Sequence, residues 1–181
     1  MPAPVVITGG GTGGHVFAMQ AIADALRARG VAPEDLRYVG SRRGQESALL
    51  AGDPVALTLL PGRGLRRSMG ARDLARNAGA TLALALAAAR AWWLVARWRP
   101  SVVVSVGGYA ALPTALAALA WRRPLVLVDL DAMPSAVHRL LGSRAAARCA
   151  AFEEGAGAVV TGAPVRAAVR AVSREDRDRR A

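Results

Sequence analysis

Two kinds of segment alternate along this chain. Short apolar runs rich in Val, Leu and Ile are separated by longer segments rich in Ala and Leu, in which polar residues recur at helical spacing. This alternation is typical of βαβ units, in which helices cover a parallel sheet. Several of the short runs are apolar throughout, as strands with helices on both faces must be. The pattern therefore predicts an α/β fold with a Rossmann-like parallel sheet flanked by helices.

Seven segments are predicted to be strands: residues 5–8, 36–39, 55–60, 102–106, 125–129, 148–152 (the weakest) and 158–161. A helix is predicted between the first two, because Met19, Ile22, Ala23 and Leu26 follow the i, i+3, i+4, i+7 spacing of a buried stripe. Gly30 is placed to cap the C-terminus of this helix. No internal repeat or low-complexity linker interrupts the pattern.

The longest predicted helix covers residues 79–98. Arg90 and Arg97 leave it fewer than the roughly 18 uncharged residues that a membrane span needs, so we predict no membrane crossing. Its three tryptophans are expected to pack in the core beside a solvated basic face. The alternative is an interfacial patch that touches lipid headgroups, together with the sequence PGRGLRRS at 61–68. The tryptophans are Trp92, Trp93 and Trp98.

Composition favours one domain in a reducing compartment. The chain has 181 residues, of which 53% are hydrophobic, enough for one buried core and too few for two ordinary domains. Cys149 is the one cysteine, so no intrachain disulfide is possible. The first residues, MPAP, form no basic leader, and we therefore expect no cleaved signal and a cytoplasmic location.

The charge predicts an anionic partner. The formal net charge is +11, and all 24 basic residues are arginine. Such an excess attracts nucleic acid, phosphate-bearing substrates or the anionic face of a membrane. Nucleic acid is disfavoured because aromatic residues make up 4% of the chain and no basic segment is interleaved with rings that stack on bases.

A glycine-rich segment follows the first predicted strand. The sequence TGGGTGGHVF, residues 8–17, has glycine at five of the six positions from 9 to 14 and opens the first predicted helix. Exposed amides and the helix dipole at such a helix start bind phosphate, and glycine lets a ligand approach the backbone. We therefore predict a phosphate site here; the alternative is a turn that only packs the helix against the strand.

The same segment also fits a dinucleotide-binding pattern. Gly9, Gly11 and Gly14 satisfy G-x-G-x-x-G, and Arg42 and Arg43, after the second strand, would suit the 2′-phosphate of NADP. An NADP-dependent oxidoreductase is therefore a second interpretation.

A second glycine pair ends the fourth predicted strand. In VSVGGYAALP, Gly107, Gly108 and Tyr109 precede another helix. Two such loops at the carboxyl ends of strands predict a ligand-binding cleft at that edge of the sheet. Tyr109 either contacts substrate through its hydroxyl or is simply a half-buried aromatic residue.

Four segments carry a resemblance to a known family. In this order and at these separations, TGGGTGGHVF, GGYAALP, MPSAVHRLLG and TGAPVR are similar to the N-terminal domain of the family 28 glycosyltransferases, which have the GT-B fold. The resemblance covers about residues 4–170. The glycine segment with its histidine, joined to the GGY loop, is specific, whereas either alone would not be.

The resemblance implies a peripheral enzyme on the cytoplasmic face of the cell membrane, in contact with the anionic inner leaflet. Such an enzyme transfers N-acetylglucosamine from UDP-N-acetylglucosamine to the muramoyl 4-hydroxyl of undecaprenyl-pyrophosphoryl-muramoyl-pentapeptide (lipid I). The product is lipid II of peptidoglycan synthesis, formed with inversion at the anomeric carbon. No cofactor is implied.

His15 is the candidate general base, because an imidazole within hydrogen-bond reach can remove the proton of a sugar hydroxyl during attack. The alternative is a histidine at the helix start that bonds only the loop backbone. In the family, Thr12, Gly13 and Gly14 lie at the junction of donor and acceptor, and the loop amides, with Gly11, are candidates to receive the acceptor's pyrophosphate. Arg166, in TGAPVR, matches an arginine that contacts the donor.

The sequence departs from the family at three places. Asp129-Leu130-Asp131 replaces a usual Glu-Gln-Asn, Ala163 replaces Asn, and Ala18 replaces Pro. Asp129 and Asp131 remain candidate substrate contacts, in a position that bears on donor or acceptor specificity. They also form a D-x-D pattern, but alternate strand residues face opposite ways, so no metal site is expected. Structural roles are expected for His138, on the helix after the fifth strand, and for Cys149, in a core strand.

The resemblance divides the chain into an acceptor-binding domain at 1–170 and the start of a linker or a frayed tail at 171–181. A GT-B enzyme also needs a donor-binding domain of similar size, which this sequence lacks. We therefore expect transfer only together with a donor half, which a separate polypeptide could supply. A non-catalytic module that binds a polyprenyl lipid or phosphate is the remaining interpretation.

Overall fold

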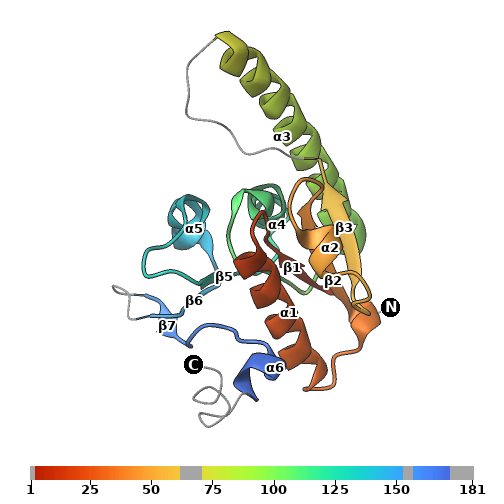
Figure 1. Cartoon of the computed structure of the whole chain (residues 1–181), viewed down its shortest axis with the longest axis vertical. Helices are drawn as coiled ribbons and strands as arrows, with labels where there is room; N and C mark the ends of the chain where they lie inside the picture. The colour runs from red at the N-terminus through yellow and green to blue at the C-terminus, as the bar shows by residue number, and fades with distance from the viewer. Residues whose placement is uncertain (1–2, 62–70, 153–156, 172–181) are drawn as a thin grey trace, which may run out of the picture.

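The computed structural model describes residues 3–61, 71–152 and 157–171. Seven parallel strands form one sheet in the order β3-β2-β1-β4-β5-β6-β7 (Figure 1). The strands are β1 (Val5–Thr8), β2 (Leu36–Ser41), β3 (Ala56–Leu60), β4 (Val102–Ser105), β5 (Leu125–Asp129), β6 (Ala147–Ala150) and β7 (Val159–Val160). The helices are α1 (Gly13–Arg27), α2 (Glu46–Leu49), α3 (Ala71–Trp98), α4 (Leu112–Ala120), α5 (Ala136–Leu141) and α6 (Ala167–Arg170). Short 3₁₀ turns cover Pro33–Asp35, Tyr109–Ala111 and Gly142–Arg144.

The predicted α/β fold is confirmed, and all seven predicted strands are present. β1 and β5 have the predicted bounds, and the other strands differ by one or two residues at their ends. The long helix begins at Ala71 instead of residue 79 and ends at Trp98 as predicted. The predicted basic loop at 61–68 lies outside the described residues after Pro61, and the predicted tail lies outside them after Ala171.

Two apolar layers hold the sheet between helices. On one face, side chains of α3, α4 and α5 pack against inward-facing residues such as Val6, Val103 and Leu127. On the other face, α1 packs against residues such as Ile7 and Tyr38. All five of these strand residues are fully buried. The sheet is thus covered on both sides, which explains the apolar runs of its central strands.

Helix α1 ends where the sequence predicts. Gly30 has a φ of +90°, its amide donates to the Arg27 carbonyl, and the Val31 amide donates to the Leu26 carbonyl. These two bonds form a Schellman motif, which needs a left-handed residue at this position. Gly30 therefore stops α1 and turns the chain toward β2.

The two central tryptophans of α3 correct a prediction. Trp92 is 49% exposed and Trp93 is 62% exposed, so core packing is wrong for both. Trp98 is half-buried and does pack against the core. Trp92 contacts Trp121 at a ring-centroid distance of 5.3 Å. Among the described residues, no helix is both long enough and apolar enough to cross a membrane, α3 included.

Candidate functional site

The two glycine loops meet at the carboxyl edge of the sheet. β1 and β4 pair in register, with Thr8 opposite Ser105, so the loops that follow them leave the sheet side by side. A Cβ added at Gly108 would lie 2.4 Å from the Gly10 carbonyl oxygen, and one added at Gly11 would lie 2.8 Å from the Tyr109 ring. The predicted neighbourhood of the two loops is therefore confirmed.

The start of α1 has three amides without a capping side chain. Thr12 is the N-cap residue, with φ −129° and ψ 157°, but its hydroxyl makes no capping bond. Instead, Thr12 Oγ1 and His15 Nδ1 share a hydrogen bond of 2.7 Å. Within the described chain, the amides of Gly13, Gly14 and His15 donate to no acceptor. Such amides, at the positive end of the helix dipole, form a site for an anion.

A buried carboxylate supports the glycine loop from below. Glu46, the first residue of α2, has no exposed surface, and its Oε1 accepts hydrogen bonds from the amides of Gly11 at 3.1 Å and Ser41 at 3.0 Å. The Gly11 amide is thus already used, so Gly11 does not offer it to a phosphate. Reasoning from the sequence missed Glu46. Its spacing after the second strand gave no signal, because the contact depends on how β1 and β2 pair.

His15 lies between the two glycine loops and is half-buried. A Cβ added at Gly107 would lie 3.5 Å from His15 Nε2, so this nitrogen faces the second loop. Burial lowers the pKa of His15 below its usual 6.5; His138 lowers it further, whereas Asp131 and Glu46 raise it. The ring is therefore neutral near pH 7. With its proton on Nδ1, toward Thr12, Nε2 keeps a lone pair that can accept a proton.

Asp129 and Asp131 have different environments. Asp131 is exposed beside the site, close enough to affect His15. Asp129 is 3% exposed, and its Oδ1 lies 2.5 Å from Nδ1 of His138. The expectation that Asp129 contacts substrate directly is wrong in this structure, because its carboxylate lies beneath the loops and faces His138. Helix α5 carries His138, as predicted, but reasoning from the sequence missed the pair.

Tyr109 lies against the first loop. Its ring faces Gly11, its hydroxyl lies 3.1 Å from Ser41 Oγ, and 36% of its surface is exposed. The exposed part leaves room for a ligand contact, while the hydroxyl ties the loop after β4 to the end of β2.

Arg166 adds a cation near the start of α1. Its guanidinium carbon lies 3.9 Å from the ring centroid of Phe17, in the second turn of that helix. A guanidinium stacked in this way is held in place with its donors still available, which suits a diphosphate.

No metal centre is evident in the part of the chain that the structure describes: three or more His, Cys, Asp or Glu side chains do not gather there in a way that could hold an ion. Arg42 and Arg43, proposed for a 2′-phosphate, are both exposed after β2.

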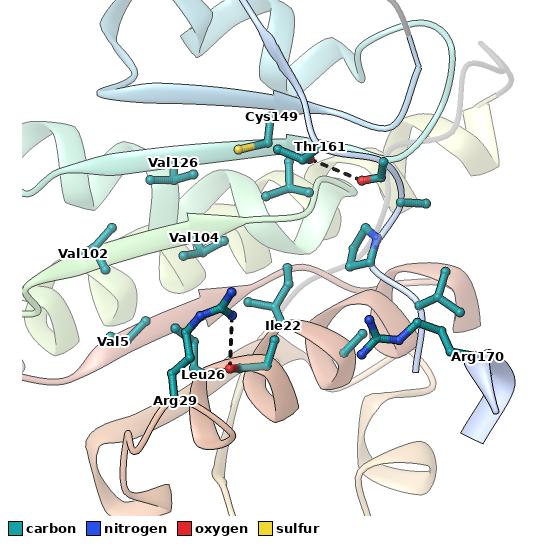
Figure 2. Close-up of a pocket in the computed structure, with 17 residues that line it drawn as sticks. Val5, Ile22, Leu26, Arg29, Val102, Val104, Val126, Cys149, Thr161 and Arg170 are labelled. Carbon is teal, nitrogen blue, oxygen red and sulfur yellow. Dashed lines mark hydrogen bonds between the residues drawn. The ribbon is translucent and has the colours of Figure 1, made fainter. Parts of the chain in front are cut away.

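A separate apolar trough of about 590 Å³ runs along the sheet face beside α1 (Figure 2). Val5, Val102, Val104 and Val126 form its floor, and the segment from Thr161 to Val165 closes one side. Its described lining includes none of the predicted site residues, so the trough and the glycine loops are different places in the fold.

Comparison with known proteins gives one family. The sequence profile of the glycosyltransferase family 28 N-terminal domain matches residues 5–149. Two curated relatives share the name UDP-N-acetylglucosamine--N-acetylmuramyl-(pentapeptide) pyrophosphoryl-undecaprenol N-acetylglucosamine transferase. The Moorella thermoacetica protein is 37% identical over 90% of this chain and 44% of its own length. The Desulforudis audaxviator protein is 34% identical over 94% of this chain and 46% of its own length.

A solved structure has the same fold. The crystal structure of MurG from Acinetobacter baumannii has a TM-score of 0.72, with 24% identity over 91% of this chain and 47% of that one. The chain spans about half the length of the curated relatives that it matches. These matches give no support to an NADP-dependent oxidoreductase or to a non-catalytic binding module.

Proposed function

Because the chain belongs to glycosyltransferase family 28, through the N-terminal domain of that family, we propose that it binds the acceptor in an N-acetylglucosaminyl transfer. The acceptor is lipid I, the donor is UDP-N-acetylglucosamine, and the product is lipid II. The names of the relatives support this choice of substrates. Transfer takes place when a donor-binding half joins this domain, since the matched relatives are about twice as long.

One observation supports the acceptor site above the others. The Thr12 hydroxyl bonds His15 instead of capping α1, which leaves the amides of Gly13, Gly14 and His15 to an anion. The pyrophosphate of lipid I is such an anion. Arg166, which the family resemblance assigns to the donor, stacks on Phe17 and places a positive charge near the same end of α1. The same bond orients His15.

His15 acts as the general base in this proposal. Nε2 accepts the proton of the muramoyl 4-hydroxyl as that oxygen attacks the anomeric carbon of the donor sugar. The new C–O bond forms on the face opposite the bond to UDP as that bond breaks, and UDP leaves with its electron pair, so the configuration inverts. The lowered pKa of His15 keeps the ring unprotonated and able to accept the proton at neutral pH.

We further propose that the exposed face of α3 rests on an anionic membrane. Leu82, Leu86, Trp93 and Arg97 recur at helical spacing and are all exposed. Apolar and aromatic side chains beside arginines suit the headgroup region of anionic lipids, and the net charge of +11 favours the same surface. The first half of α3, which includes Leu82, projects beyond the sheet (Figure 1), so a planar surface can reach that end of the stripe.

The transfer proposal is tested with the chain combined with a donor-binding half, a soluble lipid I analogue and UDP-N-acetylglucosamine. We expect His15→Ala to lower kcat by about 10²-fold or more, the usual contribution of a general base. Arg27→Ala is the matched control, because Arg27 is exposed at the far end of the same helix and its ion pair with Asp24 contributes little. Unchanged turnover by His15→Ala would exclude His15 as the base.

The membrane proposal is tested by cosedimentation of the chain with phosphatidylglycerol and phosphatidylcholine vesicles. Trp93→Ala should weaken binding to the anionic vesicles, whereas Val169→Ala should not. Val169 is 51% exposed on α6, which lies at the opposite end of the molecule from the start of α3 (Figure 1). Equal binding by both variants would show that α3 does not form the contact.

A further inference from the structure

Three buried polar side chains form a line of hydrogen bonds beneath the glycine loops. Asp129 Oδ1 lies 2.5 Å from His138 Nδ1, and His138 Nε2 lies 2.9 Å from Ser105 Oγ. Ser105 ends β4, Asp129 ends the neighbouring strand β5, and His138 lies on α5, which follows β5. Exposure of the three side chains ranges from 0% to 3%. Neither the family resemblance nor the sequence pattern assigned a joint role to this group.

Donor and acceptor roles make the line directional. The Asp129 carboxylate can only accept, so Nδ1 of His138 carries a proton. On a neutral ring Nε2 then accepts from the Ser105 hydroxyl, and Ser105 Oγ in turn accepts from the Gly107 amide at 3.4 Å. The order of the side chains is that of a serine hydrolase triad. Ser105 has no exposed surface, however, so it cannot reach a substrate as a nucleophile.

The line ends at the backbone that faces His15. Gly107 has a φ of +91°, and a Cβ built there would lie 3.5 Å from His15 Nε2 and 3.6 Å from His138 Cε1. Both imidazoles therefore line the space directly beside the Gly107 backbone. Ser135 fixes the His138 end of this arrangement, because its hydroxyl accepts the His138 amide at the start of α5.

We propose that His138 is a positioning residue for the transfer reaction: held by Asp129, it fixes Ser105 and Gly107, and through them the distance between His15 and the acceptor hydroxyl. This inference rests on the proposed function of His15. Geometry supports this role: three polar groups are kept in the core, where burial is costly unless each is bonded, and their line reaches the backbone beside the base.

The environments of His138 and His15 are also linked electrostatically. The groups that face the two rings are Asp129 from β5, Arg148 from β6 at 3.8 Å from Asp129 Oδ2, and Asp131 and Glu46 beside His15. His138 is among the groups that lower the pKa of His15, so the two rings are electrostatically coupled. Loss of the line should therefore change the environment of the His15 ring as well as that of the Gly107 backbone.

The chain has only two histidines, which makes the first test direct. In the tag-free 181-residue chain, the imidazole carbon–proton signals of His15 and His138 are followed by NMR between pH 4.5 and 8.5. We expect His138→Ala, which breaks the line, to move the His15 midpoint and to shift the Gly107 amide signal, and His138→Gln, which keeps both hydrogen bonds, to move them less. This measurement needs no transfer, so it stands even if the proposed reaction fails.

The second test compares kcat and KM in the transfer assay described above. Gln can donate to Asp129 and accept from Ser105, whereas Ala can do neither. We therefore expect His138→Ala to lower kcat by about 10- to 100-fold, as a misplaced catalytic group does, with KM for the donor unchanged. His138→Gln should recover most of the loss, and Ser105→Ala, a smaller change, should lie between them.

Leu140→Ala is the control, because Leu140 is 68% exposed on the same helix and takes no part in the line. Circular dichroism of each variant establishes that it folds, and if His138→Ala does not fold, Ser105→Ala and His138→Gln carry the test. The proposal is overturned if the His15 midpoint and the Gly107 signal stay in place in His138→Ala, or in Ser105→Ala where His138→Ala does not fold. It is also overturned if kcat changes no more in Ser105→Ala than in Leu140→Ala.

Discussion

Replacing Gly108 by Ala tests whether the two glycine loops touch as described. Gly108 has φ +80° and ψ 161°, a region that is essentially restricted to glycine. Strain from this conformation costs about 1–3 kcal/mol. The new Cβ would also lie 2.4 Å from the Gly10 carbonyl oxygen, a rigid backbone atom, and ordinary carbon–oxygen contacts begin near 3.3 Å. The loops must therefore part by almost an ångström.

Overpacking of this kind adds about 1–3 kcal/mol, so Gly108→Ala should lower the free energy of unfolding by about 2–6 kcal/mol. Gly52→Ala provides the matched control. Gly52 has the same φ of +80°, and a Cβ there would meet nothing within 4 Å. The control should cost about 1–3 kcal/mol from backbone strain alone. The difference between the two variants measures the contact between the loops.

Urea unfolding followed by circular dichroism measures both values, and an unchanged m-value would show that only stability has changed. The same preparation of Gly108→Ala should also be impaired in transfer, because the loop that faces His15 has moved. Equal destabilisation by Gly108→Ala and Gly52→Ala would refute the contact between the loops and, with it, the geometry of the site.

Three further predictions concern buried ionisable groups. Glu46→Ala leaves two amides without an acceptor and should lower the free energy of unfolding in urea by about 2–6 kcal/mol, whereas Glu46→Gln, which keeps an acceptor oxygen, should lower it clearly less. Equal losses would contradict the role of Glu46 as the acceptor of these amides. Burial lowers the pKa of His15, so its NMR titration midpoint should lie below 6.5, and Asp131→Asn, which removes a carboxylate that raises this pKa, should lower the midpoint further. Because the unfolded chain then binds this proton more tightly, the free energy of unfolding should fall as pH drops through 6.5. Burial and Asp53 raise the pKa of Tyr38, so the phenol loses its proton more easily in the unfolded chain, and the free energy of unfolding should fall as pH rises above about 10. Tyr38→Phe should remove this fall from the measured pH dependence of unfolding.

Apolar patterning was sufficient to predict the sheet. β1, β4 and β5 are short apolar runs that each end in one polar residue, and helices cover both faces of the sheet, so the pattern and the burial agree in these strands. The stripe of α1 and its stop at Gly30 follow local rules of helix geometry. Prediction was weaker for α3, whose outer face carries Leu and Trp where a helical pattern leads one to expect burial.

The candidate site was predictable only in part. His15 and the glycine loops follow strands directly, so their place at the carboxyl edge follows from the βαβ order. Glu46 and His138 reach the site through contacts with residues 35 and 33 positions away. Such contacts depend on how the strands pair, so no short sequence spacing predicts them. Asp129 shows the same limit, because its position at a strand end gave no indication that its carboxylate would turn toward α5.

The central claim is that the acceptor's pyrophosphate binds at the start of α1, beside His15. Titration of the ¹⁵N-labelled chain with a soluble lipid I analogue, followed at the backbone amide signals, tests it most directly. We expect the signals of Gly13, Gly14 and His15 to move together along one saturating curve, and an analogue without the pyrophosphate to leave them in place. If those three signals stay in place while others respond, the acceptor binds elsewhere and the account is contradicted.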